Sequence, residues 1–173
     1  MKKFNKNKGI LFWITGLSGS GKTSIAKKIK NHITKKYGPT IILSGDELRK
    51  IFKLNGYSKE NRLIYALSYS KFCQKITNQK MNVIFSTVSL FSKVRTWNKS
   101  NINNYIEIYI KSDIKKIIKL KKKYFYIKKT SNVLGQDIKP EFPLNPNIII
   151  NNNLKKNIFE LSQTLIRKID KII

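Results

Sequence analysis

An eight-residue segment, 16–23, reads GLSGSGKT and matches the phosphate-binding pattern G-x-x-x-x-G-K-[ST]. Its glycines allow backbone N–H groups to converge on phosphate oxygens, and the N-terminus of a following helix adds its dipole. Lys22 can reach the β and γ phosphates of ATP, and the Thr23 hydroxyl can hold Mg²⁺. The sequence therefore predicts a site for ATP and Mg²⁺, with Lys22 as a catalytic residue and Thr23 as the metal ligand. The predicted ATP-binding residues are Gly16, Leu17, Ser18, Gly19, Ser20, Gly21, Lys22, Thr23 and Ser24.

The segment has the neighbours that such a loop requires. Residues 10–15 form a short apolar run typical of a buried strand, and residues 23–37 carry apolar side chains at helical spacing before Gly38-Pro39. A flexible Gly/Ser turn that matched the pattern by chance would need neither a strand before it nor a helix after it. The motif does not by itself separate a kinase from a GTPase or a motor. No N-K-x-D motif for guanine recognition follows a strand, which disfavours a GTPase. The chain is also too short for an oligomeric ATPase module, so a small kinase is the favoured interpretation.

The remaining pattern predicts an α/β fold in one domain spanning residues 1–173. The expected class is a three-layer P-loop kinase with a five-stranded parallel sheet in the order 2-3-1-4-5. Between 122 and 147 the pattern gives way to lysines, aromatics and three prolines, and such a stretch predicts a lid over the site. The further strands are expected at 40–43, 83–86, 105–110 and 148–150, and the further helices at 46–52, 58–79 and 154–173, with Ser58 as an N-cap.

Composition sets outer limits on function. The formal net charge is +27, and the lysines of the chain are spread over nearly every segment. This distribution favours general solvated charge, which would steer anionic substrates, and disfavours a dedicated nucleic-acid-binding surface. The apolar run near the N-terminus is too short for a signal or membrane segment, so a cytoplasmic protein with no membrane partner is expected. Cys73 is the single cysteine, and the single histidine, His32, is interpreted as a surface residue rather than a catalyst.

Six segments in order resemble motifs of the adenylylsulfate kinase family, and the resemblance extends over about residues 13–147. The family's L-D-G-D-x-x-R, G-F-S-x-x-x-R, K-G-L-Y and G-x-D-x-P-x-E-x-P-x-N-P have counterparts here, as do its P-loop and its fourth strand. This resemblance implies transfer of the ATP γ-phosphate to the 3′-hydroxyl of a nucleotide, and because relatives are often dimers it leaves a homodimer open. The matching segments are 13–26, 43–49, 56–62, 105–109, 123–126 and 135–146.

The resemblance also implies roles for individual residues. Asp46 would orient the attacking hydroxyl and accept its proton, and the guanidinium groups of Arg49 and Arg62 would clamp the substrate's phosphate. Taken alone, these residues are better interpreted as a helix-capping aspartate and two solvated arginines, but the matching neighbours reverse that preference in favour of the functional interpretation. The residues expected to bind substrate are Asp46, Arg49, Arg62, Thr87, Ser89, Lys123, Val133 and Gly135.

The chain departs from the family where the resemblance places the substrate base. The family's S-F-I-S-P-Y-R corresponds to STVSLFS at 86–92, and its F-T-G to VLG at 133–135, so Thr87 and Val133 replace two phenylalanines that stack on adenine. The family's E-N-I-R-R becomes IYALS at 64–68, its R-D becomes Leu-Lys at 120–121, and Ser44 replaces an aspartate. These changes predict retained chemistry with a pocket that lacks stacking aromatics and takes a different base.

One branch of the family fits this pattern, and the chain looks most like it. Its members phosphorylate the 3′-hydroxyl of cytidine diphosphoramidate, for modification of capsular polysaccharide. A pyrimidine is smaller than adenine and could do without the double clamp. Two alternatives stay open: adenylylsulfate is the substrate, or the chain is a basic P-loop module that binds nucleic acid with little phosphotransfer.

Overall fold

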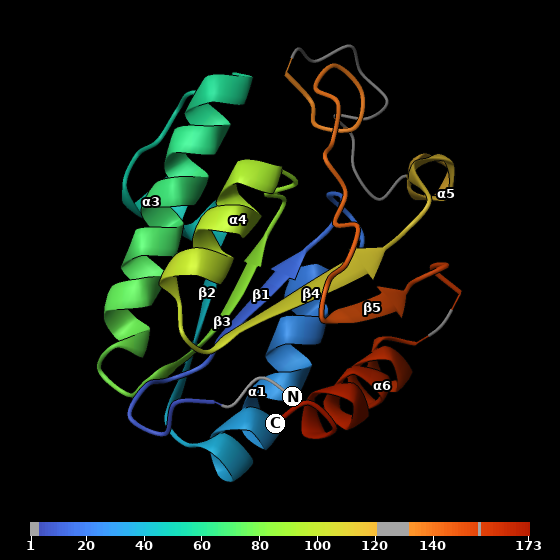
Figure 1. Ribbon diagram of the computed structural model, residues 1–173. Coiled ribbons are helices and arrows are strands. Elements are labelled where there is room, and N and C mark those ends of the chain that lie inside the picture. The colour runs from blue at the N-terminus through green and yellow to red at the C-terminus, as the bar shows by residue number, and fades with distance from the viewer. Residues whose placement is uncertain (1–3, 121–131, 156) are drawn as a thin grey trace.

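The computed structural model describes residues 4–120, 132–155 and 157–173. Its five strands are all parallel and follow the order β2-β3-β1-β4-β5 (Figure 1), which confirms the predicted α/β class and sheet order. Since β1 lies in the middle of the sheet, the P-loop that follows it is central among the strand ends. The strands are β1 Leu11–Thr15, β2 Thr40–Ser44, β3 Asn82–Thr87, β4 Tyr105–Lys111 and β5 Ile148–Asn151.

Helices cover both faces of the sheet. Helices α3 and α4 lie on one face and α1 and α6 on the other (Figure 1). Apolar side chains of α3 and α4 pack with Leu11 and Trp13 of β1, whereas those of α1 and α6 pack with Phe12 and Ile14. The alternation follows from the pleat of β1, in which successive side chains point to opposite faces. Both faces are therefore buried, as expected for a parallel sheet. The helices are α1 Lys22–Tyr37, α2 Gly45–Ile51, α3 Lys59–Thr77, α4 Ser92–Asn101, α5 Ile114–Lys119 and α6 Ile158–Asp170.

Most element boundaries agree with the sequence within two residues, and Ser58 does cap α3 by accepting from the Asn61 backbone N–H at 3.1 Å. The last helix is the exception, because it begins at Ile158 and not at 154. Leu154 has a φ of 64°, a left-handed conformation that cannot continue a helix, and Asn157 caps the true start by accepting from the Phe159 N–H at 2.7 Å. Among the described residues, no helix is both long enough and apolar enough to cross a bilayer.

A polar contact joins the ends of α1 and α6. Asp170 accepts hydrogen bonds from the Tyr37 hydroxyl at 2.6 Å, pairs with the Lys36 ammonium at 3.0 Å, and lies 3.0 Å from His32 Nε2. His32 is thus a half-buried structural residue away from the P-loop. Partial burial acts to raise the pKa of Asp170, but the hydrogen bonds from Tyr37, His32 and Lys36 outweigh it and hold that pKa at about 2.

We expect Asp170→Asn to lower the free energy of unfolding by about 1 kcal/mol at pH 6, because a neutral amide forms weaker contacts with these partners. The folded-state pKa lies below the ordinary value of 3.8, so this stabilisation is present above about pH 4 and is lost as the pH falls toward 2. Urea denaturation of both proteins at several pH values measures the difference. A gap between wild type and variant that is unchanged from pH 6 to pH 2.5 would contradict the assignment.

Candidate functional site

The P-loop connects the carboxyl end of β1 to the first turn of α1. Gly16 has a φ of 151°, and a Cβ built on it would lie 2.5 Å from the Ile110 carbonyl oxygen of β4, so only glycine fits here. Gly21, with a φ of 88°, precedes α1 directly. Asn152, which follows β5 and is 3% exposed, donates from its side chain to the Ser20 carbonyl at 2.9 Å. No sequence pattern pointed to Asn152, since one polar residue in an asparagine run carries no signal.

The side chains expected to act on phosphate lie at this loop. Lys22 is buried and its ammonium donates to the Leu17 carbonyl at 2.7 Å, which holds it inside the loop. Thr23 is exposed, and its Oγ1 lies 3.3 Å from Ser86 Oγ at the end of β3. The buried Ser20 hydroxyl has no hydrogen-bond partner among the described residues. A backbone cradle with a lysine and a hydroxyl fits a nucleotide phosphate with its Mg²⁺.

A second pocket lies beside the carboxyl ends of β2 and β3, and it brings five of the expected substrate-binding residues together. They come from four places in the chain: helix α2, the first turn of α3, the end of β3 and the loop after it. These five residues are Asp46, Arg49, Arg62, Thr87 and Ser89. Ser44 and Ser86 are partners in the β2–β3 register, and Thr23 contacts Ser86, so this pocket and the P-loop adjoin.

The two arginines of the pocket are held by carbonyls and by tyrosine rings. The Arg49 guanidinium lies 4.2 Å from the ring centre of Tyr57 and 5.0 Å from that of Tyr65, and it donates to the Gly56 carbonyl. Arg62 donates to the Tyr57 carbonyl at 2.9 Å. Arg49 Nε is buried and has no hydrogen-bond partner among the described residues. The guanidinium planes are therefore oriented before any ligand binds, which suits recognition of a phosphate.

Two of the other expected substrate-binding residues, Val133 and Gly135, lie elsewhere. Val133 is 6% exposed, packs into the apolar cluster under α3 and α4, and is not among the residues that line the pocket. Gly135 adjoins the P-loop instead, since a Cβ on it would lie 3.1 Å from the Leu17 side chain. Lys123 lies outside the described residues. Ser44, which replaces a family aspartate, caps α2: it accepts from the Glu47 N–H at 3.2 Å and donates to the Glu47 carboxylate at 2.7 Å.

The expectation of a pocket without stacking aromatics is wrong for this pocket. Tyr57, Tyr65, Tyr69 and Phe91 all line it, together with Ala66 and Val88. The prediction considered the two positions that Thr87 and Val133 occupy and overlooked tyrosines that approach from other elements. The sequence did contain a signal, since Tyr65 and Tyr69 are four residues apart and so share a face of α3.

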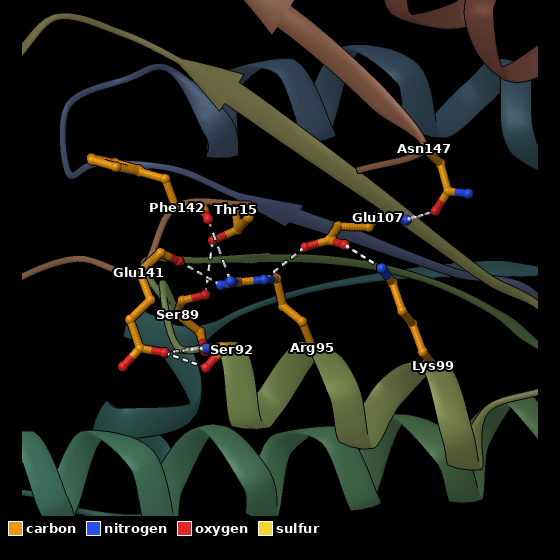
Figure 2. Close-up of polar contacts among 9 residues, drawn as sticks. All are labelled: Thr15, Ser89, Ser92, Arg95, Lys99, Glu107, Glu141, Phe142 and Asn147. Atoms are coloured by element: carbon orange, nitrogen blue, oxygen red, sulfur yellow. Dashed lines mark hydrogen bonds and ion pairs between the residues drawn. The ribbon is translucent and has the colours of Figure 1, made fainter. Parts of the chain in front are cut away.

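A buried ion-pair cluster ties the segment before β5 to the helices and the sheet (Figure 2). The Arg95 side chain of α4 donates to the Glu141 carbonyl at 2.7 Å, while its Nε lies 3.2 Å from the Glu107 carboxylate of β4. Lys99 is 3.7 Å from the other oxygen of Glu107, a residue that is 1% exposed. Burial raises the pKa of Glu107, and the positive charges of Arg95 and Lys99 oppose that rise.

The Glu141 carboxylate caps α4, which begins where the loop after β3 ends. It accepts from the Ser92 backbone N–H at 2.6 Å and from the Ser92 hydroxyl, and these bonds lower the pKa of Glu141 (Figure 2). The Glu141 N–H donates in turn to the Leu90 carbonyl at 2.9 Å. On the other side of this loop, the Thr15 hydroxyl donates to the Ser89 carbonyl at 3.0 Å. The loop that carries Ser89 is thus fixed at several points.

The parallel sheet, the P-loop and the adjoining pocket define an ATP-dependent phosphotransferase of the P-loop kinase class. The family model described as adenylylsulphate kinase matches residues 8–151. The chain is also 36% identical to the cytidine diphosphoramidate kinase of Campylobacter jejuni subsp. jejuni serotype O:2, over 95% of this chain and 98% of the relative. This protein therefore belongs to the adenylylsulfate kinase family.

One further relative agrees with that assignment, and one solved structure agrees with the fold. A probable adenylyl-sulfate kinase of Pyrococcus abyssi is 28% identical over 92% of this chain and 94% of its own. The crystallised adenylylsulfate kinase CysC of Mycobacterium tuberculosis, in complex with AMPPNP and adenylylsulfate, has the same fold with a TM-score of 0.83, 22% identity and coverage of 94% of this chain and 98% of its own. A nucleotide kinase that uses ATP is the function that these relatives share.

We expect Arg95→Met to lower the free energy of unfolding by about 3 to 5 kcal/mol, because it leaves the buried Glu107 carboxylate without its nearest cation. Adding Glu107→Gln should recover part of that loss, since the amide carries no charge to bury. Urea denaturation of the two single variants and the double variant measures the coupling. Arg167→Met, on the exposed face of α6, is the control and should change stability by less than about 0.5 kcal/mol. Purely additive losses would contradict the pairing.

Proposed function

We propose that this protein transfers the γ-phosphate of ATP to the ribose 3′-hydroxyl of cytidine diphosphoramidate, giving 3′-phosphocytidine diphosphoramidate for capsular polysaccharide modification. One observation carries the proposal most directly: Asp46, Arg49 and Arg62 line one pocket that adjoins the P-loop. A carboxylate and two arginines beside a phosphate cradle are what transfer to the hydroxyl of an anionic nucleotide requires.

The proposed roles follow from the position and chemistry of each side chain. Asp46 is exposed in the first turn of α2, where its carboxylate can orient the ribose hydroxyl and take its proton. Arg49 and Arg62 bind the diphosphoramidate end with planar donors. Lys22 supplies positive charge to the transferring phosphoryl group. Thr23 would hold Mg²⁺, and the bound ion would supply positive charge that offsets the charge of the ATP phosphates.

The choice of acceptor rests on two supports. The relative with 36% identity is named for cytidine diphosphoramidate, and it matches nearly the whole chain. The pocket also presents threonine and not phenylalanine at position 87. Adenylylsulfate is the second candidate, since the relatives at about 28% identity are adenylyl-sulfate kinases and the pocket retains aromatic walls. A basic nucleic-acid-binding module is disfavoured because a catalytic carboxylate would have no use there.

Initial rates of ADP release with each acceptor test the substrate. We expect kcat/KM to be at least about tenfold higher with cytidine diphosphoramidate than with adenylylsulfate, since the two acceptors differ in base and in the group on the distal phosphorus or sulfur. Identification of a 3′-phosphorylated product by NMR completes the test. A preference for adenylylsulfate would refute the proposed acceptor. Tight binding of duplex DNA at physiological salt with no turnover of either acceptor would refute phosphotransfer altogether.

We expect Lys22→Ala to reduce kcat by about 10³-fold or more, because it removes charge compensation at the transferring phosphoryl group. Steady-state ADP release measures the loss. Lys27→Ala, on the exposed side of the same helix, removes an equal charge outside the P-loop and should retain wild-type kcat. Equal rates for the two variants would remove Lys22 from the mechanism.

We expect Asp46→Asn to lower kcat by roughly 10²- to 10⁴-fold while changing the KM for the acceptor by less than about threefold, since the amide keeps the shape of the side chain but cannot accept the proton. The same assay, with both substrates varied, separates the two parameters. Glu60→Gln in the first turn of α3 is the matched neutralisation and should leave kcat unchanged. Wild-type turnover by the Asp46→Asn variant would exclude a role for this carboxylate in the transfer.

A further inference from the structure

Tyr69 is a buried phenol that the roles above do not use. It lies on α3, is 5% exposed, and lines the same pocket as Asp46 and Arg49. Its hydroxyl has no hydrogen-bond partner among the described residues, although its oxygen is shielded from solvent. A buried hydroxyl without a partner is costly, and such a group at the wall of a pocket indicates a partner that arrives with the ligand.

The ring of Tyr69 is fixed by the core. It packs on Phe85 of β3 with ring centres 5.7 Å apart, and Phe85 stacks on Trp13 of β1 at 4.8 Å. The ring edge also adjoins the turn before Asp46, since Tyr69 Cε2 would lie 3.8 Å from a Cβ on Gly45. These contacts account for the ring and leave the hydroxyl unexplained. Phenylalanine would make the same packing contacts, so the oxygen is the feature that needs a function.

Charge divides the pocket into two kinds of surface. The guanidinium groups of Arg49 and Arg62 suit the anionic end of a nucleotide, whereas Tyr65, Ala66 and Phe91 form an apolar and aromatic wall. A base stacks or packs on such a wall, and its polar edge then needs a buried donor or acceptor. Burial raises the pKa of Tyr69, against the opposing effect of Arg49, so the phenol stays neutral and can both donate and accept.

We infer that Tyr69 is a specificity-determining residue whose hydroxyl hydrogen-bonds the polar edge of the nucleobase of the acceptor nucleotide. This inference rests on the proposed function, since it assumes that the acceptor in this pocket is a nucleotide. The buried Ser89 hydroxyl lines the same pocket, and it too has no hydrogen-bond partner among the described residues. Two such hydroxyls provide the polar positions with which an otherwise apolar wall selects one base edge.

Calorimetric titration of the full chain with the P-loop saturated by Mg²⁺ and AMPPNP tests the inference, because the ligands then reach only the acceptor pocket. The probes are CDP and ribose 5-diphosphate, the same ligand without its base. We expect Tyr69→Phe to weaken CDP binding about tenfold and to leave binding of ribose 5-diphosphate and the KM for ATP unchanged. Tyr105→Phe removes a buried phenol that does not line this pocket, and it should alter neither affinity.

The outcomes separate the inference from the proposed function. Unchanged CDP affinity in Tyr69→Phe, or equal weakening of both probes, overturns the contact with the base. If the wild-type protein does not phosphorylate cytidine diphosphoramidate, the proposed acceptor is overturned. The binding comparison then uses ADP in place of CDP. A loss of ADP affinity in Tyr69→Phe, with unchanged affinity for ribose 5-diphosphate, supports the role of Tyr69 with an adenine base. Thermal denaturation of the Tyr69→Phe variant, which should match wild type within a few degrees, shows that the ring still packs.

Discussion

The carboxyl ends of the five parallel strands meet at one edge of the sheet, and every group assigned to the site depends on that constraint. The P-loop follows β1, Asp46 follows β2, Thr87 and Ser89 end or follow β3, and Asn152 follows β5. Parallel strands need crossover helices, so each strand end leads into a loop and then a helix on this same edge. Residues up to 136 positions apart, such as Gly16 of the P-loop and Asn152, thereby reach the same edge of the sheet, where Asn152 donates to the Ser20 carbonyl.

The sheet places these loops at one edge but does not fix their conformations. The buried charged residues fix the loop between β3 and α4. Arg95 connects Glu107 in the sheet to the carbonyl of Glu141, whose carboxylate caps α4. A buried ion pair adds little net stability compared with apolar packing, but it restricts the alternatives, because any other arrangement would leave a charge unpaired. The loop between β3 and α4 is therefore held at its start by Thr15 and at its end by Glu141. Ser89 is itself the residue that Thr15 holds, through its backbone carbonyl.

The sequence predicted the sheet order, nearly all elements and the shared pocket of Asp46, Arg49 and Arg62, because each depends on local patterns that a parallel sheet brings together. It failed at one helix start that the local backbone conformation decides, and at side chains whose positions depend on long-range contacts. The start of α6 was misplaced since apolar spacing continues through Leu154, while the deciding feature is a left-handed residue before an asparagine cap. Val133 was expected in the pocket from its place in a motif, yet it packs in the core. Tyr57 was overlooked because its stacking on Arg49 cannot be inferred without coordinates, whereas the helical spacing of Tyr65 and Tyr69 was a signal that was not used.

The pocket's aromatics change what the lost phenylalanines mean. Kinases of one family must keep the residues that bind and transfer phosphate, because the transferred group is the same for every acceptor. The base of the acceptor takes no part in the bonds that form and break. Substitutions on the wall of the pocket can therefore redirect base choice while the chemistry persists. The resemblance places Tyr65 where the family has asparagine and Thr87 where it has phenylalanine, so in this chain the aromatic side chain of the wall lies on α3 and not at the end of β3. In the proposed function, a surface on a helix next to Arg49 would constrain the base and the anionic end of the acceptor together, which would couple recognition of the base to the orientation of the ribose hydroxyl.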